Sequence, residues 1–504
     1  MAAIALSLPG ESQLSNRSHF PFDILTVDKS ARLPLHRQLY DTLRSLILSG
    51  RLRAGSTLPA TRSLAQQLKL GRNTVSAAYE RLLTEGYVEA RPGRGTWVAN
   101  LPDRPATPPG APPVGGRSPI SRRGEALATR LQPLRNPNKI NFQPGFPEVS
   151  NFPFATWAKL LARNARRRSG DLLGYYHFAG HPRLRAAIAD YVTISRGVSC
   201  TPDRVVVVTG AQAGLDLVAR LLLDDGDPVW MEEPGYWGAR SALEAAGAAL
   251  HPLFVDGDGW ALDDPTLPEP RLIYVTPACQ WPLGTTMRME ERLHLLSRAE
   301  RHGAWIIEDD YDGEYRFRGQ PLPAMQGLDR ADRVIYLGTF SKTLFSSLRI
   351  GFLIVPDALV EPFNRAVGVT GQFTPLLLQV TLADFIEQGH FATHLKRMRR
   401  VYGERQKEFI ALCRKHLGSW ITVSDNESGM QVIARFTSGM DDVKIVEIGH
   451  AHGIDLQPIS INYHHKIPEQ GLLLGYAALN ERDIQTAVMA LKASFAEARK
   501  RGAF

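Results

Sequence analysis

One stretch of the sequence, GTFSKTLFSSLRIGF at residues 338–352, places an amine, two hydroxyls and a guanidinium close together. The amine is that of Lys342, the hydroxyls belong to Thr339 and Ser341, and the guanidinium is that of Arg349. A cation nearby lowers the pKa of a lysine and helps it form a Schiff base with an aldehyde, and a guanidinium suits a phosphate dianion. An isolated lysine is more often a solvated surface charge, so this stretch needs support from elsewhere in the chain.

A second candidate stretch is the acidic run IIEDDYDGEY. Asp309 and Tyr311 are two residues apart at the end of a predicted strand, so their side chains point the same way. An aspartate there can hold a protonated pyridine nitrogen, and a phenol can bind a ring hydroxyl. Taken alone, such a run is more often a calcium-like or solvated loop.

Two further motifs follow predicted strands. In TGAQAGLDLV a helix starts directly after Gly210, so the backbone N–H groups of Ala211 and Gln212 form a phosphate cup at its positive end. In EEPGYW a Pro-Gly turn presents the ring of Tyr236. Small residues after a strand usually mean packing, and a lone tyrosine is usually a core aromatic. Together the four motifs favour a ligand site over these usual interpretations, because each supplies a different contact for one ligand, pyridoxal phosphate.

The elements that must position these residues alternate along the chain after about Ile140. Strand-like runs occur at 204–210, 228–235, 271–277, 304–312, 333–339 and 350–356, with helical segments between them. This alternation predicts an α/β domain with a mostly parallel sheet covered by helices, whose ligands bind at the carboxyl ends of the strands. The four motifs lie at those ends.

A chain of 504 residues is too long to fold around a single hydrophobic core, so at least two domains are expected. We divide it into residues 24–99, a linker at 100–139 and a large domain at 140–504. The linker is rich in Pro, Gly and basic residues. The net charge of +8 is uneven, with +7 in residues 24–99, +5 in the linker and −3 in the large domain. The basic front end suggests a surface that faces nucleic acid, although a solubility tail is the alternative.

Residues 24–99 read as a compact, mainly helical unit. A helical stripe from Leu35 to Ile47, two further short helices and an alternating run around RPGRG predict three helices and a two-stranded wing. Such an arrangement is a winged helix-turn-helix. The second helix of its helix-turn-helix unit is predicted to begin near Asn73. The candidate contacts to double-stranded operator DNA are Arg62, Arg72, Asn73, Thr74 and the wing glycines Gly93 and Gly95. Any one of them could equally be a cap or turn residue.

The same segments resemble two known families. LPATRSLAQQL, GRNTVSAAYERLLTEGYV and RPGRGTWV resemble the DNA-binding domain of the GntR superfamily, and the region from about residue 140 resembles a fold-type-I aminotransferase domain. With GYYHFAGHPRLRAAIADYV, VTPACQWPLG and the motifs above, the whole chain is similar to the MocR family of GntR-type regulators. The resemblance implies that Lys342 forms the Schiff base, that Asp309 pairs with the pyridine nitrogen, and that Tyr236 stacks on the ring.

The resemblance also implies a phosphate site and a homodimer. Tyr311 would bind the ring hydroxyl, and Tyr175 would reach the phosphate of the partner subunit, so that each site lies at the subunit interface. The phosphate would otherwise be held by Ala211, Gln212, Thr339, Ser341 and Arg349.

Three positions depart from the family pattern. Cys279 replaces a histidine of the P-x-H-Q-x-P turn, and Ser346 replaces a proline. Leu473, in LLLGYAAL, stands where relatives that bind amino acids carry an arginine that clamps the carboxylate. A leucine cannot bind a carboxylate, so ordinary transamination and an amino-acid effector are both disfavoured. Pyridoxal phosphate itself, with vitamin B6 genes as targets, or another amine ligand is then the expected effector.

Three interpretations therefore stay open. The leading one is a transcriptional regulator that binds DNA as a homodimer and senses a small molecule through pyridoxal phosphate. The second is an active aminotransferase with an appended DNA-binding domain, and the third is a scaffold that binds DNA without cofactor. Three distant cysteines give no metal spacing, and the absence of a long apolar run or an export leader predicts a cytoplasmic protein without a membrane contact.

Overall fold

The computed structural model describes Phe20, Leu25 and residues 27–31, 33–91, 95–101, 120–121, 124–125, 139–167, 170–174, 177–319, 323–465 and 469–502. Packing divides the chain into two compact units, one up to Arg117 and one from Ser118. Most of the predicted linker lies outside the described residues.

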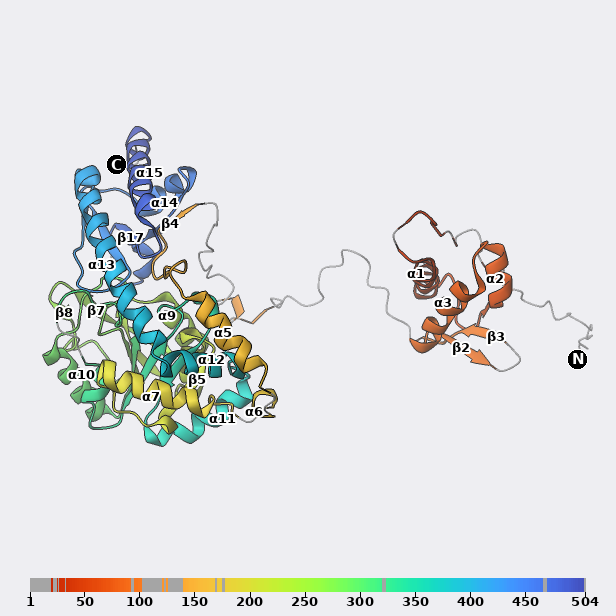
Figure 1. The fold of residues 1–504 in the computed structure, drawn as a ribbon, viewed down its shortest axis with the longest axis horizontal. Helices are drawn as coiled ribbons and strands as arrows, with labels where there is room; N and C mark the ends of the chain where they lie inside the picture. The colour runs from red at the N-terminus through yellow and green to blue at the C-terminus, as the bar shows by residue number, and fades with distance from the viewer. Residues whose placement is uncertain are drawn as a thin grey trace, which may run out of the picture. The chain divides into compact units, whose positions relative to one another are not determined.

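The N-terminal unit consists of three helices and a small sheet (Figure 1). The apolar stripe predicted from Leu35 forms α1 (Leu35–Leu48), which packs on α3 (Arg72–Thr84) and buries Leu39 and Leu43. The shorter α2 (Thr61–Gln67) completes the core. The wing is formed by β2 (Val88–Arg91) and β3 (Gly95–Val98), which pair antiparallel, with β1 (Thr57–Leu58) on the other side of β3. The predicted winged helix-turn-helix architecture is confirmed.

The large unit is built on an eight-stranded sheet. In spatial order the strands are β5 (Val205–Val208), β12 (Gly351–Ile354), β11 (Val334–Thr339), β10 (Trp305–Asp310), β9 (Leu272–Val275), β6 (Pro228–Glu233), β7 (Ala249–Asp256) and β8 (Gly259–Trp260). The strands from β11 to β7 run parallel, whereas β12 is antiparallel to both of its neighbours. The six predicted strand runs are all present, and the mostly parallel sheet is confirmed.

Helices cover both faces of this sheet, as its continuous apolar strands require. The helices α8 (Ala211–Leu222), α9 (Trp237–Ala245) and α11 (Val360–Thr370) share one buried cluster with Val206 and Val208 of β5. On the opposite face, Val205 and Val207 pack in the cluster that includes α7 (Pro182–Arg196) and α12 (Leu376–Glu387). The α10 helix (Met289–His302) covers Ile273 and Ile306 on that same face.

A smaller C-terminal layer packs beside the main sheet. It contains the four-stranded sheet β13 (Ile421–Val423), β14 (Gln431–Phe436), β17 (Gly471–Gly475) and β16 (Gln457–Pro458). The helices α13 (His390–Leu417), α14 (Asp442–Ala451) and α15 (Glu481–Lys500) accompany it, and β4 (Ile140–Asn141) pairs with β15 (Ile454–Asp455). The helices α5 (Phe154–Ala165) and α6 (Gly170–Leu173), which follow β4 in the chain, pack instead against α12.

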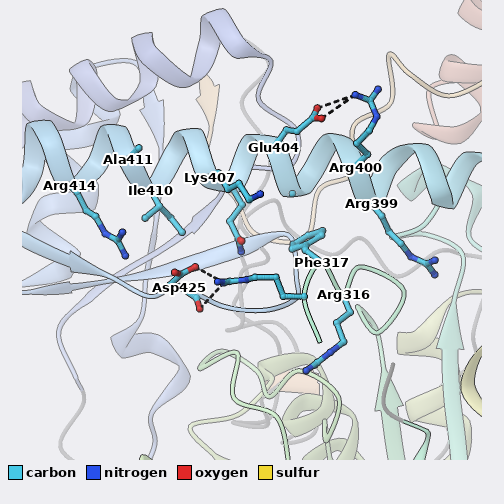
Figure 2. A pocket seen from close by; sticks show the side chains of 13 residues that line it. Arg316, Phe317, Arg399, Arg400, Glu404, Lys407, Ile410, Ala411, Arg414 and Asp425 are labelled. Carbon is cyan, nitrogen blue, oxygen red and sulfur yellow. Dashed lines mark hydrogen bonds and ion pairs between the residues drawn. The ribbon is translucent and has the colours of Figure 1, made fainter. Parts of the chain in front are cut away.

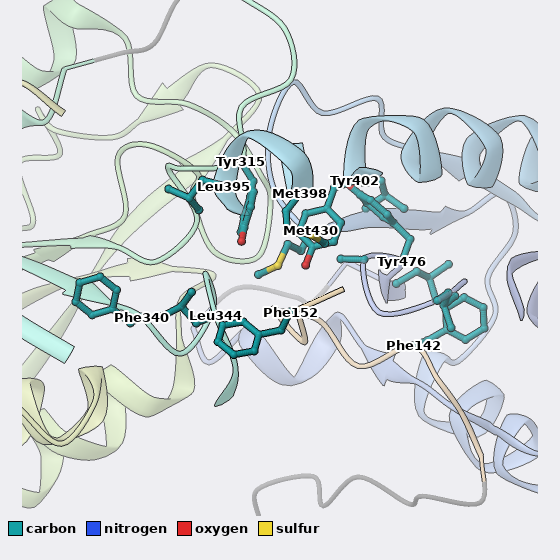
Figure 3. Packing of buried hydrophobic residues seen from close by; sticks show 14 of the residues in the cluster. Phe142, Phe152, Tyr315, Phe340, Leu344, Leu395, Met398, Tyr402, Met430 and Tyr476 are labelled. Carbon is teal, nitrogen blue, oxygen red and sulfur yellow. The ribbon is translucent and has the colours of Figure 1, made fainter. Parts of the chain in front are cut away.

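One continuous apolar cluster joins the two layers (Figure 3). It brings Phe340 and Leu344, which flank Lys342, against Leu395 and Met398 of α13. Anchors on both sides hold the segment after β11 in place, so the lysine between them has a fixed position. In the part of the chain that the structure describes, no helix combines the length and the apolar character needed to cross a membrane.

Candidate functional site

Nine of the ten predicted cofactor residues line one cavity of about 420 Å³. Tyr175, the tenth, lies outside the described residues. The nine come from four separate motifs, and the fold brings them together because β5, β6, β10 and β11 end at the same edge of the sheet. They are Ala211, Gln212, Tyr236, Asp309, Tyr311, Thr339, Ser341, Lys342 and Arg349.

The first turn of α8, where the sequence predicts a phosphate cup, lies close to the Arg349 guanidinium. Gly210 has a φ of +87° at the start of α8, and a Cβ added to it would lie 3.1 Å from the Arg349 guanidinium carbon. Glycine therefore lets the guanidinium approach the first turn of the helix. Arg349 itself has a left-handed φ of +52° and donates from Nη2 to the carbonyl oxygen of Thr209 at 3.0 Å. A non-glycine residue in that conformation at a site is strained backbone held by its surroundings.

Lys342 points into the cavity from the segment after β11. Its Nζ donates a hydrogen bond to the carbonyl oxygen of Gly145 at 2.9 Å. Burial lowers the pKa of Lys342, while the carboxyls of Asp312 and Asp309 act in the opposite direction. A lower pKa increases the share of neutral amine, which is the form that attacks an aldehyde.

Asp309 lies at the end of β10 and is held by a residue that sequence reasoning missed. The hydroxyl of Tyr274, on the neighbouring strand β9, donates to Oδ2 of Asp309 at 2.8 Å. Burial raises the pKa of Asp309 to about 7. Oδ1 of Asp309 has no hydrogen-bond partner among the described residues.

Other polar atoms of the cavity are also buried without a protein partner. Within the described residues, Oε1 of Gln212 and Oγ of Ser341 find no hydrogen bond. The Tyr311 hydroxyl interacts with the Cys279 thiol, but no described nitrogen or oxygen atom bonds to it. Buried polar groups are normally satisfied, so unpartnered ones that converge on one cavity indicate a ligand. Their chemistry fits pyridoxal phosphate, which offers a protonated nitrogen, a ring hydroxyl and a phosphate.

The walls of the cavity are aromatic. The ring of Trp281 meets those of Tyr236 and Tyr311 edge to face, with centroids 6.0 and 5.8 Å apart. The indole nitrogen of Trp281 donates to Oδ1 of Asn462 at 3.0 Å, which fixes the ring. Other lining residues outside the predicted set are Gly145, Phe146, Trp237, Tyr274 and Ser346.

Leu473 lies in the middle of β17, between Ile433 and Gln457 of the neighbouring strands, and is fully buried. It belongs to an apolar cluster with Trp281 and Ile459. The position that the family pattern gives to a carboxylate-binding arginine is therefore an apolar core position here. Among the described residues that line the cavity, the cations are Lys342 and Arg349.

The predicted DNA contacts lie in the N-terminal unit. Arg62, on α2, and Arg72 and Asn73, in the first turn of α3, have exposed side chains, while Thr74 is half-buried. Gly95 opens β3 with a φ of +99°, a value that favours glycine at the wing turn. Gly93 lies outside the described residues. The exposed residues at the start of α3 are those that a winged helix offers to a groove.

Comparison with known proteins agrees with both units. Residues 35–98 match the family of bacterial regulatory proteins of the gntR type, and residues 137–491 match aminotransferase class I and II. A probable rhizopine catabolism regulatory protein, MocR, from Rhizobium meliloti is 52% identical over 95% of this chain and 97% of its own length. The chain belongs to the MocR-type regulators of the GntR family.

Another MocR-type relative is the pyridoxine biosynthesis regulator PdxR of Corynebacterium glutamicum, 31% identical over 73% of this chain and 76% of its own. Solved structures place the large unit among pyridoxal-phosphate aminotransferases. The α-aminoadipate aminotransferase LysN of Thermus thermophilus, complexed with a phosphopyridoxyl-leucine, has a TM-score of 0.65 and 28% identity and covers 76% of this chain and 96% of its own. The Pyrococcus horikoshii kynurenine aminotransferase, complexed with PMP, has a TM-score of 0.68 at 25% identity and covers 75% of this chain and 97% of its own.

The protein is thus a transcription regulator with a winged DNA-binding head and an aminotransferase-like domain whose cofactor is pyridoxal phosphate.

Proposed function

We propose that the large domain senses a small molecule through pyridoxal phosphate anchored on Lys342, and that two heads of a homodimer transmit its state to operator DNA. The observation that carries the proposal is the convergence of nine predicted residues on one cavity with unpartnered buried polar atoms. When bound, the cofactor supplies an aldehyde that an amine can capture and a ring that withdraws electrons.

We assign the protein side chains as follows. Lys342, whose pKa is lowered by burial, is the covalent anchor. Asp309, held by Tyr274, accepts from a protonated ring nitrogen, and Tyr311 donates to the ring hydroxyl. The first turn of α8 and the guanidinium of Arg349 bind the phosphate, with hydroxyls from Thr339 and Ser341 beside them.

Of the effectors that the sequence leaves open, we favour a primary amine without a carboxylate. Leu473 does not line the cavity itself but packs in an apolar cluster with Trp281, which does, so this wall of the cavity is apolar where an amino acid needs a cation. The relative that is 52% identical regulates a catabolic process by its name, which also favours a metabolised ligand over pyridoxal phosphate itself. Vitamin B6 control, as the name of PdxR states for that protein, is the alternative that titration with cofactor tests.

The homodimer is supported by an apolar surface near the cavity. Leu173 is 88% exposed beside Phe178, and the Phe178 ring meets that of Phe373 with centroids 5.7 Å apart. Thr209 Oγ1 donates to the backbone carbonyl oxygen of the neighbouring Gln372 at 3.1 Å, which links this surface to the cofactor motif after β5. Apolar side chains that gather at such a surface indicate a protein partner, and a second copy would place its own residues beside the cavity mouth. We propose that this dimer acts in the cytoplasm.

The test follows the cofactor's absorption band while DNA binding is measured. Purified protein is titrated with pyridoxal phosphate, with butylamine and with 4-aminobutanoate, two probes that differ by a carboxylate. We expect butylamine to shift the band at a lower concentration than 4-aminobutanoate and to change affinity for the DNA upstream of the protein's own coding region. Steady conversion of 4-aminobutanoate and a keto acid would instead support an active aminotransferase.

Leu473→Arg sharpens the same test. We expect it to lower the concentration of 4-aminobutanoate needed by about tenfold and to leave butylamine unimproved, because a guanidinium adds a charge-assisted contact of about 1.5–3 kcal/mol. An unchanged cofactor band reports that the variant folds. Equal responses of both proteins to both probes would contradict the assignment of Leu473.

A further inference from the structure

A second cavity, of about 490 Å³, opens between the long helix α13 and the segment at residues 316–318 (Figure 2). We call it the basic groove. None of its residues lines the cofactor cavity. It is lined by Arg316, Phe317, Arg318, Arg399, Arg400, Gly403, Glu404, Gln406, Lys407, Ile410, Ala411, Arg414 and Asp425.

The groove concentrates positive charge on a domain whose net charge is slightly negative. Its lining contains six Lys or Arg side chains and two carboxylates. Residues 140–504 as a whole carry 39 Lys and Arg against 42 Asp and Glu. A local excess of that size, against the balance of the domain, creates a positive potential that attracts anions.

Three of the six cations are not neutralised by carboxylates in the described part of the chain. Arg318 pairs with Asp425 at 2.5 Å, Arg316 pairs with Glu427, and Arg400 pairs with Glu404 at 3.1 Å. By contrast, Nε of Arg399 donates only to the backbone carbonyl of Glu314 at 2.5 Å.

Lys407 and Arg414, both exposed, form no ion pair with any residue that the structure describes. Figure 2 shows them along α13 on the side of the groove. These side chains are available to an external anion.

The cations form a line rather than a compact cup. The three cations without a carboxylate partner, Arg399, Lys407 and Arg414, lie eight and seven residues apart on α13, about 12 and 10 Å along a helix, so the line extends over about 22 Å. Between them the Phe317 ring packs against the helix beside Gly403, 3.5 Å from where a Cβ would lie, which is ordinary van der Waals contact. A linear row of separated cations suits an extended polyanion better than a single phosphate group.

We propose that the basic groove binds the phosphate backbone of DNA that flanks the site held by the winged heads. The inference rests on the proposed function, because the head brings DNA to a domain joined to it through the same chain. Covalent connection raises the effective concentration of that DNA at the groove. Lys and Arg contacts to phosphates add affinity without sequence preference, so the groove extends the bound length of DNA.

The groove is also connected to the cofactor cavity through one short segment. Tyr311 lines the cavity and Arg316, five residues later, lines the groove. Between them, the Tyr315 hydroxyl donates to the backbone carbonyl of Thr343 at 3.3 Å, next to Lys342. A ligand that displaces this segment therefore moves a DNA-facing cation as well.

The test uses the full-length protein loaded with cofactor and the double variant Lys407→Glu/Arg414→Glu. The matched control is Lys396→Glu/Lys415→Glu, which makes the same charge change at exposed positions of α13 outside the groove. Binding to duplexes of 20 and 60 base pairs from upstream of the protein's own coding region is measured between 50 and 200 mM salt. An unchanged cofactor absorption band confirms that each variant is folded.

We expect the groove variant to bind the 60-base-pair duplex at least tenfold more weakly than the control does. The slope of log affinity against log salt should fall by about 2 for each subunit in contact, because each lost phosphate contact removes about 0.9. On the 20-base-pair duplex the two variants should bind equally.

Equal affinities and slopes of the two variants on the long duplex would overturn the proposal. So would thermal stabilisation by inorganic tripolyphosphate that the groove variant alone loses while its DNA binding stays unchanged, since the groove would then be a small-anion site. If the unmodified protein binds neither duplex, the proposed function itself fails. Failure of the groove alone leaves DNA binding by the heads intact.

Discussion

The cofactor cavity and the winged head differ in how their recognition residues are arranged. The cavity gathers residues from Gly145 to Arg349, spread over more than 200 positions, and buries several of their polar atoms without protein partners. The head presents Arg72, Asn73 and Thr74 from one helical turn, mostly exposed to solvent. One site is enclosed and assembled by the fold, and the other is open and local.

The difference predicts how each site responds to change. A buried cavity depends on the position of each atom, because unpaired polar groups in it are costly and charged contacts are strong. An open basic surface depends mainly on charge and salt, and each of its contacts contributes modestly. The following substitutions test this contrast, from the largest expected effect to the smallest.

Lys342→Ala should abolish covalent retention of the cofactor and the absorption band that reports it. No other described lysine lines the cavity, so no neighbouring amine can replace it. Absorbance after dialysis measures the loss. DNA binding by the heads should persist at a fixed level that no longer responds to ligand, and a retained band would contradict the anchor.

Arg349→Ala should raise the dissociation constant for pyridoxal phosphate about a hundredfold, equivalent to about 3 kcal/mol. Arg349→Lys keeps the charge and loses the planar fork, so a smaller loss of about tenfold is expected. Equilibrium titration of cofactor-free protein gives both values. Equal affinities of the alanine variant and the parent would show that the guanidinium does not hold the phosphate.

Asp309→Asn should stabilise the cofactor-free protein at pH 8 by roughly 2 kcal/mol while weakening cofactor binding. The pKa of this carboxyl is 3.8 when unfolded and about 7 in the fold. The folded chain therefore keeps a proton that the unfolded chain loses, and the contribution to stability falls as pH rises from about 4 to 7.

Thermal unfolding of the cofactor-free protein between pH 5 and pH 8 measures this effect. The parent should lose more stability over that range than the Asn variant does, because Asn has no proton to lose. Parallel curves for the two proteins would contradict the raised pKa.

Arg72→Ala should weaken specific DNA binding by about 1–3 kcal/mol and leave the cofactor band untouched. Arg37→Ala, an exposed arginine of α1, is the matched control and should have a smaller effect. Gel-shift or anisotropy measurements at a stated salt concentration make the comparison. A loss that is equal for both variants would mean that the head reads DNA by charge alone.

The strand ends and their motifs could be predicted from the sequence, because Asp309, Tyr311 and Lys342 lie at or just after apolar runs that are recognisable as β-strands. Gly145, whose carbonyl oxygen receives the Lys342 hydrogen bond from 197 positions away, was not predicted. Tyr274 was also not predicted, because its role depends on β9 lying beside β10, and the sequence of a strand does not show which strands are its neighbours. The signal for Tyr274 was present only as a polar hydroxyl inside an otherwise apolar run.

The basic groove was missed for a similar reason. No charge pattern in α13 was singled out from the sequence, and only the packing of residues 316–318 against this helix brings its cations into one groove. Tyr175, Gly93 and most of the linker lie outside the described residues, so their predicted roles stay predictions.

The unpartnered polar atoms of the cavity also bear on how much of this protein a cell holds. Oδ1 of Asp309, Oγ of Ser341 and Oε1 of Gln212 cost folding free energy until a ligand satisfies them. A ligand that binds only the folded state stabilises it by mass action, and a gain of 1–2 kcal/mol can change steady-state abundance several-fold through proteolysis. We therefore expect the cofactor supply to set the lifetime of the regulator, before any effector alters its grip on DNA.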